Sequence, residues 1–401
     1  MKQTRPARGN RDRKTHLSAD AERLVTGALG MANSGSRVED RFWEIQIAQR
    51  LQTLLDDGHP QPLYDALDRL HQTDLEAYGA LVETVEEVAE SLILEHEGQP
   101  WQILLVAAPV VAWTRFTIPA GPIPAPLART LASHWCEHVL MPEVRFHMSP
   151  AVYSVDQLPR DYGELRRLTR RLGLAALRGT DAKGVSKLPE SAEMLADARF
   201  FVGAVAVPPG APVFRWQAVD LRNQGGRVQA LERWVEHARE LVEQVLPGCG
   251  FECLLPDAYH LNMRESDRRV RPFNIRASVH FMTHALAVEP GQIGATIAAF
   301  GGERVDEFRV GLAIDPEGVE IAHGVIWPLL GAESESDEPS PLDQIRQQLM
   351  DAGVTRIHVW PDVVEPEYCE DCGAPLYPNN RAELIHAELP SDVVPESVHF
   401  H

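Results

Sequence analysis

The sequence predicts a mixed α/β (α+β) fold in which an all-helical N-terminal segment precedes three β-β-α-β units with mixed sheets. Two observations lead to this prediction. Apolar residues before position 98 recur mostly at helical spacing. After position 100 one pattern occurs three times: two extended segments, an amphipathic helix, and a short apolar strand that ends in proline, at Pro150, Pro256 and Pro361.

The N-terminal segment contains four predicted helices with recognisable start signals. Ser18, Ser36 and Asp74 are of the types that cap helix N-termini, and Pro62 is favoured in a first helical turn. Gly98 is of the type that ends a helix. The expected helices are Ser18–Ala32, Arg37–Leu55, Pro62–His71 and Asp74–Gly98.

The three units follow from residue 101 onward. Their paired extended segments are Ile103–Ala108 with Val110–Ile118, Phe200–Val207 with Val213–Asp220, and Phe308–Ile314 with Val319–Trp327. Their helices are Pro126–Leu140, Arg227–Leu246 and Pro341–Ala352. Two further helices act as crossovers, Tyr162–Leu177 and Phe273–Ala287. A strand, Ile293–Phe300, precedes the third unit.

These patterns divide the chain into six regions. The first is a disordered basic tail and the last resembles a zinc knuckle, while the others are the helical segment and the three units. The predicted boundaries are 1–16, 17–98, 101–177, 198–288, 293–366 and 367–401.

Composition excludes several classes of protein. The 401 residues contain no apolar run long enough to cross a bilayer, and the first twenty lack the apolar core of a secretory signal. We therefore expect a cytoplasmic protein without membrane contact, whose five cysteines are reduced. The net charge of −20 disfavours nonspecific binding to nucleic acid.

Arginines are nevertheless concentrated beyond the proline anchors, next to polar residues at the ends of the strands. Guanidinium groups in such clusters suit phosphate or carboxylate recognition, so we predict an anion site there. The alternative is that the arginines neutralise neighbouring acidic helices. The candidate residues are Tyr153, Arg166, Arg167, Arg170, Arg171, Asp257, Tyr259, Arg264, Arg268, Arg269 and Asp362.

The strongest local motif is Cys369-Glu-Asp-Cys372-Gly373. Two thiolates separated by two residues, with glycine directly after the second, are typical of a structural zinc knuckle. Since zinc takes four ligands, we predict that His386 and His399 complete the site. A reduced cysteine pair in a hairpin and a redox dithiol are the alternatives.

A second motif, His134-Trp-Cys-Glu-His138, matches the H-x-x-E-H pattern of some zinc peptidases. The second predicted unit contains the related segment Trp234-Val-Glu-His237, which also suggests an inherited helix face without a metal. His280 and His284 have the same spacing as the first pair, but apolar neighbours favour partly buried histidines there.

Three segments, Ser34–Trp43, Ala108–Arg115 and Cys369–Pro378, resemble a family of uncharacterised cytoplasmic proteins from Gram-negative bacteria, classed only as a domain of unknown function. The resemblance covers nearly the full length and implies no activity. Two hypotheses remain. One is a noncatalytic module with a structural zinc knuckle that binds an anionic small molecule, nucleotide or nucleic acid through its Arg-rich segments. The other is a metal-assisted hydrolase that uses carboxylates or histidines at strand ends.

Overall fold

The computed structural model describes residues 17–180, 188–191, 194–217, 226–302, 304–330, 333–334 and 337–390. The predicted basic tail 1–16 and His399 lie outside the described residues. The chain forms two compact units. One comprises the described residues up to Ser91 together with Asp161–Leu168, and the other comprises Leu92–Arg160 and the chain from Thr169 onward.

The first unit is a bundle of four helices, which confirms the predicted helical segment. Its helices are α1 (Ala19–Ala32), α2 (Arg37–Asp56), α3 (Gln61–Thr73) and α4 (Leu75–Glu90). The side chains of Ser18, Ser36 and Asp74 accept hydrogen bonds from backbone amides in the first turns of α1, α2 and α4. Leucines and other apolar residues from all four helices form one buried core.

The fourth helix is shorter than the sequence predicted. It ends at Glu90, and β1 (Ser91–His96) follows directly. Glu97 and Gly98 both have positive φ, at 53° and 74°, as a two-residue hairpin turn into β2 (Gln99–Trp113) requires. Gly98 therefore completes a hairpin turn and does not end a helix, so the predicted helical boundary at residue 98 was wrong.

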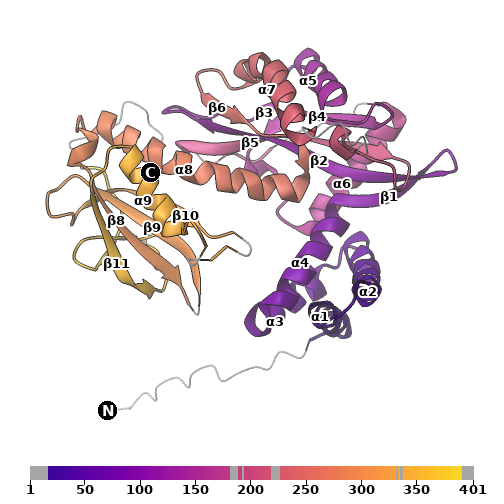
Figure 1. Cartoon of the computed structure of the whole chain (residues 1–401), viewed down its shortest axis with the longest axis horizontal. Coiled ribbons are helices and arrows are strands. Elements are labelled where there is room, and N and C mark those ends of the chain that lie inside the picture. Colours follow the sequence, from indigo (N-terminus) through magenta and orange to yellow (C-terminus); the bar gives the residue numbers. More distant parts are fainter. Residues whose placement is uncertain are drawn as a thin grey trace, which may run out of the picture. The chain divides into compact units, whose positions relative to one another are not determined.

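The second unit contains a seven-stranded sheet that joins the first two predicted β-β-α-β units (Figure 1). Its main strands have the order β6-β2-β5-β4 and are antiparallel throughout, which is the connectivity of a ferredoxin-like β-α-β-β-α-β motif. Each half thus ends in a strand that pairs with the long strand of the other half. The elements are β2, α5 (Ala125–His138), β4 (Arg145–Tyr153), β5 (Ala196–Val207), α7 (Gly226–Val245) and β6 (Gly250–Cys253), with β3 (Gly121–Pro122) and β7 (Asp257–Ala258) at the margins.

Neither of these two halves has the predicted pair of extended segments. In the first half, β2 is one strand that continues through Pro109. Proline is tolerated here because Pro109 faces the break between β6 and β7, where no strand residue requires a hydrogen bond from its missing N–H. The carbonyl of Pro109 accepts a hydrogen bond from the amide of Leu254. In the second half, Arg215–Gln217 forms a 3₁₀ turn, η2, and residues 218–225 lie outside the described part.

Helices cover both faces of this sheet. α5 and α7 pack against each other on one face, and α8 (Tyr259–Ala285) runs across the other (Figure 1). α8 begins fourteen positions before the predicted start at Phe273, because the helix continues through Pro272. The remaining helical elements are α6 (Tyr162–Arg178), η1 (Val155–Gln157) and η3 (Pro290–Gln292). Every helix of the described residues is too short or too polar to span a bilayer.

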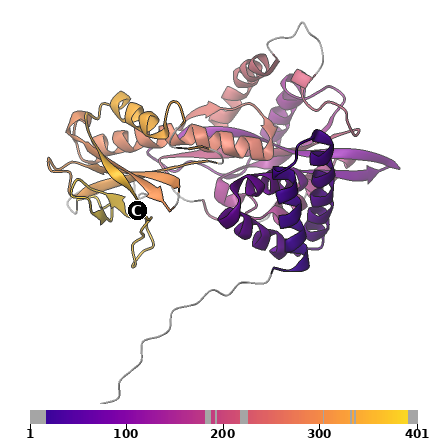
Figure 2. The same cartoon turned by 60° about the horizontal axis from the view of Figure 1, so that its bottom comes forward.

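A four-stranded sheet of order β10-β9-β8-β11 follows. Its strands are coloured orange to yellow in Figure 2. Here β9 and β10 form a hairpin, while β11 pairs parallel with β8. In the first two halves, by contrast, the last strand of each half pairs with the long strand of the other half. Three equivalent units are therefore not confirmed. The elements are β8 (Gly294–Gly301), β9 (Val305–Ala313), β10 (Ile321–Pro328), α9 (Pro341–Asp351) and β11 (Arg356–Val364).

The two faces of this second sheet are covered differently. α8 and α9 supply the apolar core on one face, where Val310 and Leu312 point. On the other face lies the C-terminal segment with β12 (Tyr377–Pro378) and β13 (Leu384–Ile385). The segment approaches so closely that a Cβ on Gly311 would collide with the carbonyl oxygen of Pro378. The candidate metal ligands therefore sit on a segment that is packed on a sheet.

Candidate metal centre

The Cys369–Gly373 segment, which we call the knuckle, forms a closed turn after β11. The amide of Cys369 donates to the carbonyl of Ala374 at 2.7 Å, and the amide of Gly373 donates to the carbonyl of Cys369 at 2.8 Å. Gly373 has a φ of 73°, a conformation that glycine adopts without the strain of a Cβ. The turn therefore brings the two cysteine side chains to the same side.

The knuckle backbone also favours the ionised form of its first thiol. Hydrogen bonds from the backbone of Cys372 and of Asp371, and then one from the Cys372 side chain, lower the pKa of Cys369. The thiolate is the form that coordinates metals. These hydrogen bonds of the turn therefore prepare Cys369 as a ligand.

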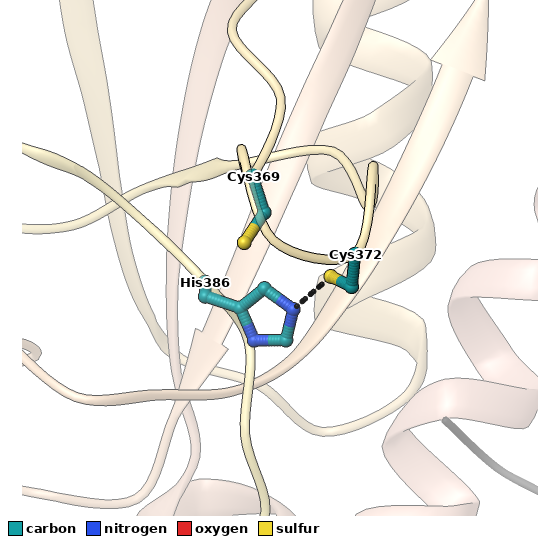
Figure 3. A group of neighbouring side chains, drawn as sticks. All are labelled: Cys369, Cys372 and His386. Carbon is teal, nitrogen blue, oxygen red and sulfur yellow. Dashed lines mark hydrogen bonds between the residues drawn. The ribbon is translucent and has the colours of Figure 1, made fainter.

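His386 completes a group of three potential ligands (Figure 3). The pairing of β12 with β13 returns the chain toward the knuckle and places His386 just after β13. Its Nε2 lies 3.2 Å from the sulfur of Cys372, and the ligand atoms of all three residues lie within 4.8 Å of one another. The structure thus brings together three of the four predicted ligands, and His399 lies outside the described residues.

Glu388 is a neighbour of this site that the sequence did not reveal. One of its carboxylate oxygens lies 3.3 Å from Nδ1 of His386. This contact is electrostatic, because Nδ1 has no hydrogen-bond partner among the described residues, whereas Nε2 faces the sulfur of Cys372. Acidic residues are frequent in this chain, so nothing in the local sequence distinguished Glu388.

Arg309, on β9, fixes the base of the knuckle. Its guanidinium group is fully buried and donates to the carbonyls of Glu367 and Leu376, each at 2.8 Å. These carbonyls belong to the two chain segments that enter and leave the knuckle. The same guanidinium pairs with the carboxylate of Glu307 at 2.7 Å and lies over the ring of Tyr368. A lone arginine in a strand carries no motif, so Arg309 could not be identified from the sequence.

The predicted anion-site residues are distributed over several elements. Arg166, in the helical unit, is buried, makes a bidentate ion pair with Asp56 at 2.7 and 3.0 Å, and donates to the carbonyl of Val88. Its charge is therefore compensated inside the protein, as the structural alternative expects. Arg167, Arg170 and Arg171 are exposed on α6.

The second arginine cluster lies on α8, in the part of this helix that precedes the predicted start at Phe273. Arg268 pairs with Glu333 at 3.3 Å, and Arg269 pairs with Glu265 at 3.0 Å. Arg264 also lies on this helix, half-buried. The ion pairs again match the alternative in which arginines neutralise acidic neighbours.

The polar residues predicted at the strand ends do not share one environment. Tyr153 and Tyr259 are buried, and the hydroxyl of Tyr153 hydrogen-bonds that of Ser149. Asp257 is buried and paired with Arg227, whereas Asp362 is exposed on β11 of the other sheet. Desolvation by burial raises the pKa of Asp257, while its hydrogen bonds and Arg227 act in the opposite direction.

The H-x-x-E-H segment forms the end of α5. The ligand atoms of His134, Glu137 and His138 lie within 4.8 Å of one another, so this segment is a second group with metal-binding potential. Its ligands are imidazoles and a carboxylate, in contrast to the sulfur ligands of the knuckle.

The sequence matches a known family model over nearly its whole length. A model of the family described as Protein of unknown function (DUF2863) matches residues 9–400. Searches of curated proteins and of solved structures returned no match. Because the matched region covers nearly the whole chain, as the sequence resemblance implied, the chain belongs to the DUF2863 family of proteins of unknown function.

Proposed function

We propose that the protein is a noncatalytic binding module whose C-terminal segment is held in place by one structural Zn²⁺ ion. Cys369, Cys372 and His386 are the proposed ligands, and His399 is the proposed fourth. The observation that carries this proposal is the convergence of two sulfurs and one imidazole nitrogen from opposite ends of the segment.

The chemistry of these ligands supports zinc. Thiolate and imidazole are the usual ligands of structural Zn²⁺, and a C-x-x-C knuckle supplies two of four tetrahedral positions. A metal bound here cross-links the knuckle to the segment directly after β13, which carries His386. Together with Arg309 at the base, it would fix the C-terminal segment on the four-stranded sheet. Such a cross-link stabilises a short segment that has little apolar core of its own.

Removal of one ligand tests the site. We expect Cys372→Ser and His386→Ala each to lower bound zinc by one equivalent per chain and to weaken zinc binding at least about a hundredfold. The metal content is measured by native mass spectrometry. In cobalt-substituted protein, the sulfur-to-cobalt charge-transfer absorption should disappear in a Cys369→Ser, Cys372→Ser double variant.

Cys249→Ser provides the control, because Cys249 is a reduced, half-buried cysteine that lies outside the knuckle. This variant should retain the zinc content and the charge-transfer band of the unmodified protein. Zinc content that is equal in the Cys372→Ser variant and the control would refute the proposal.

A second candidate function is the binding of an anionic ligand, such as a nucleotide, by α6. It is supported by Arg170 and Arg171, which are exposed, are next to each other, and have no ion-pair partner among the described residues. Clustered guanidinium groups of this kind can form charge-assisted hydrogen bonds to phosphate.

The test is titration of a fluorescent nucleotide at two salt concentrations. We expect salt-sensitive binding that falls at least about tenfold in an Arg170→Glu, Arg171→Glu variant. Arg304→Glu with Arg346→Glu makes the same change in net charge elsewhere and should leave binding unchanged. Equal loss in both double variants would mean that only net charge matters and would exclude a site on α6.

A further inference from the structure

The helices α5 and α7 carry the same four-residue pattern at their contact. Trp135 is followed by Cys-Glu-His138, and Trp234 is followed by Val-Glu-His237. Both tryptophans are fully buried, and their rings meet edge to face with centroids 6.0 Å apart. Because each histidine follows its tryptophan by three residues, roughly one helical turn, both histidines emerge near the same seam between the helices.

A third histidine joins this pair. His134 precedes His138 by four residues on α5, so their rings lie on one side of that helix. The ring centroids are 5.7 Å apart for His134 and His138, 5.4 Å for His134 and His237, and 4.3 Å for His138 and His237. Three imidazoles from two helices therefore form a compact cluster.

The size of the cluster matches a metal-centred arrangement. With Zn–N distances of about 2.0–2.1 Å and tetrahedral angles, the centroids of three coordinating imidazoles lie about 5 Å apart. The separations of His134 from His138 and from His237 are slightly longer than this distance, and that of His138 from His237 is slightly shorter. The ligand atoms of Glu137, His134 and His138 lie within 4.8 Å of one another, so Glu137 is available for the fourth position. His237 is outside this group, and its exposed side chain has to turn for Nε2 to join the other ligand atoms.

The ring nitrogens are also suitable for coordination. Nδ1 of His237 lies 2.8 Å from the carbonyl oxygen of Arg233, which fixes the proton on Nδ1 and leaves a lone pair on Nε2. The His138 side chain is only 9% exposed, yet its Nε2 has no hydrogen-bond partner among the described residues, and neither has Nδ1 of His134. A buried ring nitrogen without a partner is costly unless a ligand satisfies it.

From this geometry we propose that His134, His138 and His237 bind a divalent transition metal of the zinc type, with Glu137 or water as the fourth ligand. This site is separate from the knuckle, because it lies on the helices that cover the seven-stranded sheet. Imidazole ligands suit Zn²⁺, Co²⁺ and Ni²⁺, whereas the thiolates of the knuckle favour softer metal ions. The site is thus a second metal centre, independent of the proposed function.

The chain contains a matched control for a histidine pair without a third ligand. His280 and His284 on α8 have the same spacing as His134 and His138, and their ring centroids are 5.6 Å apart. Both are exposed, and no third imidazole contacts them among the described residues. If two histidines on one helix were sufficient, this pair would bind metal equally well.

The experiment uses the full-length chain with Cys369→Ser and Cys372→Ser, so that the knuckle does not contribute. Titration with Zn²⁺ and Co²⁺, followed by calorimetry and native mass spectrometry, should show one bound metal per chain. The cobalt spectrum should contain ligand-field bands without sulfur charge transfer. His237→Ala should weaken binding at least about tenfold, while His280→Ala should have no effect.

His237 is suited to this test because its side chain is exposed, and circular dichroism will show whether the helices are retained. Equal affinity in the His237→Ala and His280→Ala variants would overturn the proposal, as would the absence of any bound metal in the knuckle-free chain. The charge-transfer band reports only on the sulfur ligands of the knuckle, and the His237→Ala titration reports only on the histidine cluster. Either proposal can therefore be refuted without affecting the other.

Discussion

Replacement of Arg309 by Met is expected to destabilise the four-stranded sheet and its C-terminal segment by about 3–5 kcal/mol, because it removes one partner of a buried ion pair. The Glu307 carboxylate, whose side chain is only 21% exposed, would lose its counter-ion. The carbonyls of Glu367 and Leu376 would also lose their donor. Met retains most of the volume, so the loss reflects charge and hydrogen bonding more than a cavity. Urea unfolding measures the change in free energy.

The control is Arg304→Met, in the connection between β8 and β9. Arg304 pairs with Asp306 at the same two-residue spacing as Arg309 with Glu307, but its side chain is 49% exposed. Exposed ion pairs contribute about 0–1 kcal/mol, so this variant should unfold nearly as the unmodified protein does. Similar unfolding midpoints for both variants would show that the buried guanidinium does not anchor the segment. Limited proteolysis after residue 364 should also become faster in Arg309→Met alone.

Trp135→Ala is the second change with a large expected effect, a loss of about 3–5 kcal/mol in the free energy of unfolding. Trp135 is fully buried between α5 and the sheet, where it contacts both Trp234 and Phe146. Its removal leaves a cavity at the contact of α5 with α7, which the surrounding helices can fill only in part. Thermal and urea unfolding provide the measurement.

Two further variants separate cavity formation from other effects. Trp135→Phe should cost clearly less, because the indole N–H has no hydrogen-bond partner among the described residues and a ring is retained. Phe116→Ala, at a side chain that is 56% exposed, should change stability by less than about 1 kcal/mol. If Trp135→Ala and Phe116→Ala were equally stable, the tryptophan contact would not be a major part of the core.

Local patterns predicted much of the fold. The first three helices of the N-terminal bundle carry signals that lie within one segment, namely apolar periodicity and, for two of them, a capping side chain. The same holds for α5, α7 and α9, whose observed limits lie within one or two residues of those predicted. Errors arose where one residue has two structural meanings. Gly98 can end a helix or complete a hairpin, and Pro272 can start a helix or lie within one.

Such local patterns could not predict which distant strands pair with each other. The sequence showed similar segments, but not that β4 pairs with β5 and β6 with β2, because this depends on contacts across the whole sheet. The third unit has similar segments in a different connectivity. Shared hydrophobic spacing therefore does not establish a shared fold.

The candidate metal ligands show the same contrast. The spacing of Cys369 and Cys372 is local and was visible in the sequence, as was the order of His134 and His138. The approach of His237 to that pair depends on the packing of α7 against α5, which the Trp-x-Glu-His similarity did not predict. Arg309 and Glu388 became apparent only from their contacts.

The reciprocal pairing of the last strands has a consequence during protein synthesis. When the ribosome has made only the first half, β2 and β4 lack β5, the strand that lies between them. Both then present unsatisfied edges to solvent until Val207 has left the exit tunnel, and such edges promote aggregation. The sheet of the nascent chain therefore closes only after the second half has been synthesised, and covering β2 and β4 until then would limit aggregation.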